Sequence, residues 1–355
     1  MHLARLLANL SPEKYELHLF VIERGGSYER LLGENVRVAT TLDAPPSSAT
    51  LALVQSVGPL GRALKDLQPS LFVSLMDNVN LYAYLAWRRS GRAGKFVACI
   101  QTSLDHSIAF GAVGKSRRVV RALLRYVYPQ ADAIVPLSHG VGRDLVRNPR
   151  IDPERVHVIH NYGIEVQEEV EYTPPADRFV IAVCGRLVPL KGFDVVIRAL
   201  GELHRQGRKP YLDVVGSGPE EDKLRTLAAS EGIAEYVDFK GFVTEPQRFF
   251  TSSSLFILSS YFEGFGNVIV EAMSVGCPVL ATDCPYGPAE IITEPRYGVL
   301  VPIGEPEPMA RAIAGLMDDP ERLASIGKAG RERARDFAPE VITAQYEELL
   351  DQLLA

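Results

Sequence analysis

The sequence predicts an α/β protein made of two doubly wound domains, and three observations lead to this fold class. Short apolar runs alternate with amphipathic, helix-like segments along the whole chain, which indicates parallel sheets covered by helices on both faces. The length of 355 residues suits two domains of about 150 residues each. Near the middle, the acidic, proline-paired stretch 165–177 lacks any periodicity and is typical of a linker.

The expected strands follow one another at regular intervals, with a helical segment between most of them. In the first half, strands are expected at residues 15–22, 36–40, 71–75, 96–100, 133–136 and 156–160. In the second half, they are expected at residues 179–184, 211–215, 236–239, 255–258, 278–281 and 298–301. The tail from residue 320 onward is expected to be helical, with a break near residues 337–339.

These elements predict an amino-terminal domain over residues 1–164, the linker, and a carboxyl-terminal domain over 178–337. A last helix, 338–355, is expected to pack back toward the amino-terminal domain. One feature is atypical, because a doubly wound domain opens with a strand and a Gly-rich turn before its first helix. This chain opens directly with the helical segment HLARLLANL, so we expect that the first strand of its amino-terminal sheet is missing.

Composition excludes several classes of protein. Apolar residues make up 46% and charged residues 23%, which excludes a disordered, collagen-like or disulfide-scaffold protein. The net charge of −6 argues against nucleic-acid binding, and no apolar run approaches the ~20 residues of a membrane span. No signal-peptide pattern is present, so we expect a cytoplasmic protein. Four scattered cysteines are expected to be buried thiols: Cys99, Cys184, Cys277 and Cys284.

The strongest candidate site is the segment EGFGNVIVE, in which seven residues separate Glu263 from Glu271. Glu263 would follow a strand at its carboxyl end, where open α/β sheets bind ligands. Gly264 and Gly266 would let a ligand approach the backbone, and Asn267 would cap a helix whose amino end favours an anion. The alternative interpretation is a capped helix that carries two solvated glutamates.

A second candidate follows the strand that ends at Gly185. Arg186 and Lys191 flank the loop into the next helix, and two cations at a strand end suit a diphosphate. The alternative is a pair of surface cations. A third candidate is the turn that contains Gly216 and Gly218, which resembles a phosphate loop only weakly and could equally be a tight strand-to-helix turn.

Together these segments resemble the family-4 retaining glycosyltransferases ("glycosyl transferases group 1"), which have the GT-B architecture of two Rossmann-like domains facing each other across a cleft. The resemblance rests on HNYGI, CGRLVPLKG, VVGSGPEEDKL, FKGFV, EGFGNVIVEAMSVGCPV and DCPYGPAEII. The first half is similar more loosely, through the opening helix, SLMDNVNLYAYLAWRRSG and ADAIVPLSHGVGRDL.

The resemblance implies a role for each candidate residue. Arg186 and Lys191 would hold the donor pyrophosphate, Glu271 the ribose, and Glu263 the transferred sugar. Backbone around Gly264 to Asn267 would contact sugar and phosphate, and the segment Gly241–Val243 would lie against the base. The implied donor site comprises Gly185, Arg186, Lys191, Gly216, Phe242, Val243, Glu263, Gly264, Phe265, Gly266, Asn267 and Glu271, of which Glu263, Arg186 and Lys191 would be catalytic.

On the acceptor side, many relatives carry a histidine after the fourth strand of the first domain. The segment VACIQTSLDHS places Gln101 there, with Asp105 and His106 nearby. His106 could substitute for that histidine, or it could be a structural or solvated loop residue.

The implied reaction is retaining transfer from a nucleotide-sugar to a glycan or lipid-linked acceptor of envelope polysaccharide or glycoconjugate synthesis, with no metal and no cofactor. UDP is favoured, because CPYGP resembles the CPSGP of members that use UDP-N-acetylhexosamines. The alternatives are a truncated or non-catalytic sugar-nucleotide-binding subunit and a sugar-nucleotide epimerase of the same architecture. A two-domain oxidoreductase would need a GxGxxG turn that neither half shows.

A basic amphipathic segment, Lys115–Val127, holds five cations in a chain that is acidic overall. Such a helix can bind an anionic membrane surface, so a peripheral position on the cytoplasmic membrane face is one hypothesis. The alternative is that its apolar face packs on the sheet and its arginines are merely solvated.

Overall fold

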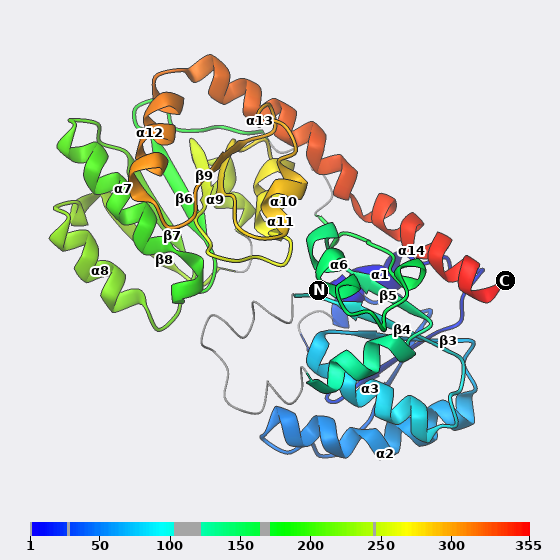
Figure 1. Ribbon diagram of the computed structural model, residues 1–355. Helices are drawn as coiled ribbons and strands as arrows, with labels where there is room; N and C mark the ends of the chain where they lie inside the picture. The colour runs from blue at the N-terminus through cyan, green and yellow to red at the C-terminus, as the bar shows by residue number, and fades with distance from the viewer. Residues whose placement is uncertain (1, 27–28, 103–121, 164–170, 244–245) are drawn as a thin grey trace. The chain divides into compact units, whose positions relative to one another are not determined.

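The computed structural model describes residues 2–26, 29–102, 122–163, 171–243 and 246–355 (Figure 1). The chain forms two compact units by internal contacts: unit 1 is Met1–Tyr162 with Pro339–Ala355, and unit 2 is Gly163–Ala338. All strand pairings in both units are parallel, which confirms the predicted α/β class.

In the part of unit 1 that the structure describes, the strands form two sheets, β1–β2 and β3–β4–β5. Its strands and helices are α1 (His2–Asn9), β1 (Leu17–Val21), β2 (Val36–Thr40), α2 (Ala49–Leu67), β3 (Leu71–Leu75), α3 (Asp77–Arg89), β4 (Lys95–Ile100), β5 (Ala133–Pro136), α6 (His139–Val146) and α14 (Pro339–Leu354). Its short 3₁₀ turns are η1 (Glu29–Leu31), η2 (Tyr128–Gln130) and η3 (Pro153–Arg155).

The last helix, α14, belongs to unit 1 although it comes from the end of the chain. Tyr346 stacks on Tyr162 with ring centroids 6.4 Å apart, and the hydroxyls of Tyr162 and Thr343 share a hydrogen bond of 3.1 Å. The backbone N–H of Ser11 donates to Oε1 of Glu347 over 2.9 Å. Apolar residues of α14 thus complete a core that also contains α1, β1 and β4.

The described residues of unit 2 contain one six-stranded sheet in the order β11–β10–β9–β6–β7–β8. Its elements are β6 (Val180–Cys184), η4 (Pro189–Lys191), α7 (Phe193–Arg205), β7 (Tyr211–Val215), α8 (Glu221–Ser230), η5 (Ala234–Tyr236), β8 (Val237–Gly241), α9 (Gln247–Thr251), β9 (Leu255–Leu258), α10 (Asn267–Ser274), β10 (Val279–Thr282), α11 (Gly287–Ile291), β11 (Val299–Val301), α12 (Pro306–Met317), α13 (Pro320–Ala334) and η6 (Arg335–Phe337).

The core of unit 2 forms because its central strands are apolar on both faces. All four residues of β9 are buried, as are the first four of β6. Helices α7 and α12 lie side by side and, with α8, pack against this sheet, whereas α10 contacts β9, α9, α11 and α13 (Figure 1). Near-continuous apolar strands of this kind are typical of parallel sheets that are covered by helices.

One expected strand is wrong. Residues 156–160 form no ladder: Val156 makes a single isolated bridge to Ile134 of β5. The N–H groups of His157 and Ile159 donate to the carbonyls of Ile134 and Pro136, so the segment runs along β5 without forming a strand. The other eleven expected strands are present as β1 to β11, with ends shifted by at most two residues.

The four cysteines are free thiols, and all except the partly buried Cys184 are buried, as expected. Burial raises the pKa of Cys99 and Cys284 to about 12, so both are neutral at physiological pH. Among the described residues, every helix is too short or too polar to span a bilayer.

Asp77, the first residue of α3, should make the stability of unit 1 depend on pH. It accepts a 2.9 Å hydrogen bond from the hydroxyl of Tyr128, and burial raises its pKa from 3.8 to about 7. The folded state therefore favours the protonated carboxyl, so the free energy of unfolding should fall as the pH rises from 3.8 to about 7. The loss should be on the order of a few kcal/mol, at about 1.4 per pKa unit.

The variant Asp77→Asn should remove most of this pH dependence, because an amide keeps the acceptor for Tyr128 and does not ionise. Urea unfolding at a series of pH values measures the effect. Asp66→Asn, at an exposed position of α2, is the matched control and should leave the pH profile unchanged. An unchanged profile in the Asp77 variant would contradict the assignment.

Candidate functional site

Both sequence-predicted motifs lie at the point where the strand order of unit 2 reverses. From β6 the chain steps outward to β7 and β8, and then returns to β9 on the opposite side of β6. Open α/β sheets bind ligands outside the carboxyl ends of the strands at such a switch point. Arg186 and Lys191 follow β6, and Glu263 and Glu271 follow β9, so residues far apart in sequence lie at one edge.

An ion pair joins the two motifs. Nζ of Lys191 donates to Oε1 of Glu263 over 2.6 Å, and the two side chains are only 22% and 14% exposed. The hydroxyl of Ser260 donates to the same oxygen over 2.6 Å. The family resemblance implies different donor partners for Lys191 and Glu263 and does not predict their contact. Ser260 was not predicted either, since nothing in the LSSYF segment singles out one hydroxyl.

The loop that carries Lys191 is bound directly to the loop that carries Glu263. The hydroxyl of Ser259 donates to the carbonyl of Lys191 over 2.8 Å, and the N–H of Tyr261 donates to the carbonyl of Leu190 over 2.9 Å. Gly192 has φ +62°, and a Cβ there would lie 2.2 Å from the carbonyl oxygen of Ser259. Only glycine permits this approach, so the LKG sequence is needed for the two loops to meet.

The second glutamate lies inside helix α10. The helix is capped by Gly266, with φ +97°, so the expectation that Asn267 is the cap is wrong: Asn267 is the first helical residue. Glu271, partly buried, follows about one turn later. The pKa of the Cys184 thiol is raised to about 12, mainly by burial and also by the Glu271 charge, whereas the Lys191 charge opposes the rise. The charges of Glu271 and Lys191 are therefore both close enough to the end of β6 to affect the ionisation of Cys184.

The turns after β6 and β7 pack against each other through glycine. The N–H of Gly185 donates to the carbonyl of Val215 over 2.9 Å, and that of Leu187 donates to the carbonyl of Ser217 over 3.0 Å. A Cβ on Gly216 would lie 1.9 Å from the carbonyl oxygen of Gly185. Gly216 thus has a packing role, and its contact with a donor stays a prediction.

Two predicted aromatic positions differ sharply in exposure. Phe242, just after β8, is 76% exposed and its ring is available for stacking, whereas the neighbouring Val243 is partly buried. Phe265 is 2% exposed and packs edge-on against Phe337 at 5.3 Å between ring centroids. The ring of Phe265 therefore belongs to the core, which leaves the backbone of its segment for ligand contact.

The CPYGP loop lies beside Glu263, a contact that sequence reasoning did not predict. Tyr286 has a φ of +82° and forms an isolated parallel bridge with Glu263. Its ring packs edge-on against that of Phe262, with the ring centroids 5.5 Å apart. A Cβ on Gly287 would lie 1.7 Å from the carbonyl oxygen of Phe265. The proline and glycine content of CPYGP is the signal that could have indicated such a tight loop.

The structure does not test the predicted acceptor-side roles. Gln101 directly follows β4 in unit 1 and is partly buried, whereas Asp105 and His106 lie outside the described residues. Most of the basic segment Lys115–Val127 also lies outside them; within the described part, Leu124 is buried and Leu123 is 45% exposed. Roles in acceptor or membrane binding stay predictions.

Curated relatives match nearly all or about half of the chain. It is 29% identical over 344 residues to the N-acetylgalactosamine-N,N'-diacetylbacillosaminyl-diphospho-undecaprenol 4-alpha-N-acetylgalactosaminyltransferase of Campylobacter jejuni, covering 94% of this chain and 91% of that one. It is 34% identical to the lipopolysaccharide core biosynthesis glycosyltransferase LpsD of Rhizobium meliloti, over 51% of this chain and 52% of that one.

Solved structures show the same fold. The Anabaena Alr3699/HepE structure in complex with UDP and glucose matches with a TM-score of 0.76 and 22% identity, covering 98% of this chain and 94% of that one. The sucrose-phosphate synthase of Thermosynechococcus elongatus matches with a TM-score of 0.78 and 20% identity, over 98% and 92% of the two chains.

Two family models match successive halves of the chain. The model for Glycosyltransferase Family 4 matches residues 1–167, and the model for Glycosyl transferases group 1 matches residues 167–333. The second match contains the Lys191–Glu263 pair and Glu271. The chain therefore belongs to the family-4, group 1 glycosyltransferases and is a glycosyltransferase built from two Rossmann-like domains.

Proposed function

We propose that this glycosyltransferase moves a sugar, with retention at its anomeric carbon, from a nucleotide-sugar donor to a hydroxyl of a glycan or lipid-linked acceptor. The observation that carries the proposal is the contact between Lys191 and Glu263 at the switch point of unit 2. Arg186 and Glu271 follow the same two strands. This edge thus combines cations for a diphosphate with carboxylates for sugar hydroxyls.

The diphosphate of the donor would meet three sources of positive potential. Arg186 can form a forked pair with phosphate oxygens, and Lys191 adds a point charge. The amino end of α10 contributes N–H groups and a helix dipole just beyond Gly266. In this proposal the two side chains stabilise the charge on the departing diphosphate, so the reaction involves no metal and no cofactor.

The proposed transfer exchanges one bond at the anomeric carbon for another. The bond from this carbon to the phosphate oxygen breaks, and a bond to the acceptor oxygen forms on the same face. The acceptor proton passes to the departing phosphate, so no protein nucleophile is needed. Glu263, oriented by Lys191 and Ser260, would accept hydrogen bonds from hydroxyls of the transferred sugar.

The comparisons support a UDP-sugar and a polyprenyl-type or glycan acceptor. The Anabaena structure contains UDP, and the Campylobacter relative is named for a diphospho-undecaprenol acceptor. The CPYGP loop beside Glu263 favours an N-acetylhexosamine donor by its resemblance to CPSGP. We further propose that the protein acts in the cytoplasm, at the membrane surface, and that Lys115–Val127 binds that surface.

Arg186→Ala and Glu271→Ala should each weaken UDP binding by roughly 10- to 100-fold. Each change removes a charge-assisted hydrogen bond worth about 1.5–3 kcal/mol. Isothermal titration calorimetry with UDP measures the effect. Arg208→Ala is the control, since its guanidinium pairs with Asp318 on the surface of unit 2, and it should bind UDP normally. Normal affinity in both site variants would exclude this site.

Glu263→Gln should lower turnover far more than it lowers UDP affinity, because its proposed partner is the sugar. Transfer from a UDP-sugar, followed by product analysis, gives kcat, and calorimetry gives the affinity. An equal loss of both would contradict the proposed role. Free hydrolysis of the donor without transfer, in the unaltered protein, would point to a different reaction.

Ser260→Ala should lower kcat by about tenfold and leave UDP affinity unchanged. Among the described residues the serine hydroxyl is one of two donors to Oε1 of Glu263, so its loss leaves the carboxylate oriented by Lys191 alone, which the donor diphosphate would also bind. Ser253→Ala, which removes another buried hydroxyl of unit 2, serves as the control and should keep full activity. Equal activity of the two variants would exclude an orienting role for Ser260.

A further inference from the structure

A buried threonine at the end of β10 reaches the loop that carries Glu263. Thr282 is the last residue of β10 and is fully buried, and its hydroxyl donates to the carbonyl of Ser260 over 2.6 Å. The backbone ladder between β10 and β9 covers Val279 to Ala281, paired with Phe256 to Leu258. The contact of the hydroxyl with the carbonyl of Leu258, at 3.4 Å, is longer and weaker. The side chain of Thr282 thus extends the contact between the two strands into the site loop.

The residues that follow Thr282 contact the site loop at two further points. Tyr286 forms the bridge to Glu263, and Gly287 packs so closely on Phe265 that a Cβ there would overlap the Phe265 carbonyl oxygen. The contacts occur in the same order along both segments, as they do between parallel strands. We refer to residues 282–287 as the backing segment.

The backing segment is held in a strained conformation where it meets Glu263. Tyr286 has φ +82° and ψ −90°, a region that residues with a side chain rarely occupy. Such a conformation persists only where the surrounding contacts impose it. The ring of Tyr286 packs against Phe262, which is 5% exposed, so the core holds the turn against the site loop.

The peptide between Ser260 and Tyr261 is held at both of its polar groups. Its carbonyl accepts from Thr282, and its N–H, which belongs to Tyr261, donates to the carbonyl of Leu190 over 2.9 Å. A peptide is planar, so these two bonds fix its orientation. The hydroxyl of the same Ser260 donates to Oε1 of Glu263 over 2.6 Å. A chain of hydrogen bonds therefore leads from Thr282 to the carboxylate.

Loss of the threonine hydroxyl would act directly on this peptide. Ser260 is 1% exposed, so its carbonyl would lose its donor in a place that water hardly reaches. A buried acceptor without a partner is costly, and the peptide would turn to find another donor. The hydroxyl of Ser260 would then turn away from Glu263.

We propose that Thr282 is a positioning residue of the transferase and that its hydroxyl orients Glu263 through the Ser260 peptide. This inference rests on the proposed function, in which Glu263 accepts hydrogen bonds from the transferred sugar. The effect belongs to turnover and not to UDP affinity, because Arg186 and Glu271, the proposed partners of the diphosphate and the ribose, are not members of this chain of hydrogen bonds.

Thr282→Val removes the hydroxyl and keeps the branched shape, so it should lower kcat by about tenfold and leave the UDP affinity unchanged. The kcat is measured with the UDP-N-acetylhexosamine that the unaltered protein transfers fastest, and calorimetry gives the affinity. Thr282→Ser, which keeps the hydroxyl, should retain most of kcat. Thr343→Val is the matched control, because Thr343 is 6% exposed and its hydroxyl donates to the carbonyl of Pro339 over 2.7 Å. This control should lose stability and keep kcat.

Hydrogen–deuterium exchange tests the same contact without any ligand. The amide of Tyr261 should exchange about tenfold faster in Thr282→Val than in the unaltered protein, and Thr343→Val should leave it unchanged. Equal exchange at Tyr261 in the two valine variants would overturn the proposal. So would full kcat in Thr282→Val, or an equal loss of kcat in Thr282→Val and Thr282→Ser.

A double variant separates this inference from the function on which it rests. Since Thr282 acts through Glu263, Thr282→Val should not lower the residual kcat of Glu263→Ala any further. A further tenfold loss in the double variant would overturn the proposal. Full kcat in Glu263→Ala alone would refute the proposed function of the carboxylate. That failure differs from one in which Glu263→Ala loses activity and Thr282→Val keeps it, which would overturn the role of Thr282 alone.

Discussion

The candidate site depends on the contact between Lys191 and Glu263. Parallel pairing of β6 with β9 brings the ends of both strands to one edge, and the ion pair then joins the two loops that follow. Gly192 permits the close approach, and Ser259 and Ser260 hold the two partners in place. A charged pair that is partly removed from water is stable only with such additional hydrogen bonds.

The same contact links structure to the proposed reaction. Lys191 neutralises Glu263 in the structure described, and a bound diphosphate would compete for the lysine. Glu263 would then depend more strongly on Ser260 and on sugar hydroxyls, so donor binding and carboxylate orientation would be coupled. The neutral thiols of Cys184 and Cys284, whose pKa values are raised to about 12, stay outside this exchange of charge.

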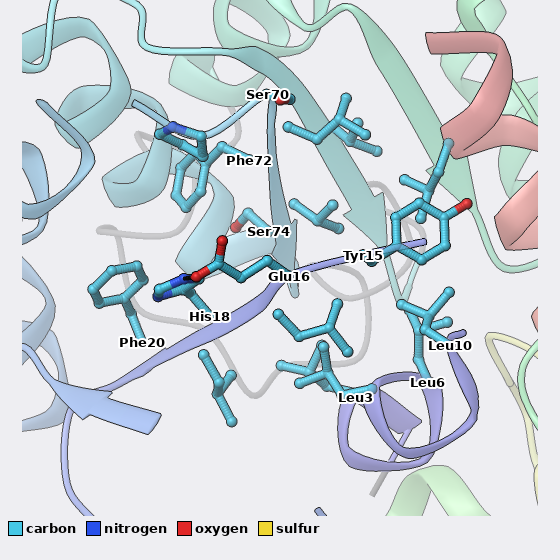
Figure 2. A pocket seen from close by; sticks show the side chains of 18 of the residues that line it. Leu3, Leu6, Leu10, Tyr15, Glu16, His18, Phe20, Ser70, Phe72 and Ser74 are labelled. Carbon is cyan, nitrogen blue, oxygen red and sulfur yellow. Dashed lines mark hydrogen bonds and ion pairs between the residues drawn. The ribbon is translucent and has the colours of Figure 1, made fainter. Parts of the chain in front are cut away.

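The two units differ in how their described strands are joined. Unit 2 has all six strands of a doubly wound sheet, and its site lies at the reversal of their order. In unit 1 the described strands form two separate sheets, β1–β2 and β3–β4–β5, and an apolar cavity of about 490 Å³ is lined by residues of β1 and β3 (Figure 2). Leucines of α1 and α14 line this cavity, and other residues of both helices belong to the core of unit 1.

The sequence by itself determined the fold class and most strand positions, and it singled out four charged residues as a candidate site, because apolar periodicity and strand-end motifs are local patterns. It did not determine which charged side chains form ion pairs. The pairing register of β6 and β9 decides that Lys191 contacts Glu263, and that Ser260 and the Tyr286 loop lie beside this pair. It also misassigned the cap of α10 and residues 156–160, where backbone geometry outweighed local preference. Contacts between distant segments arise only when the sheet forms, and for that reason only the tertiary structure decided them.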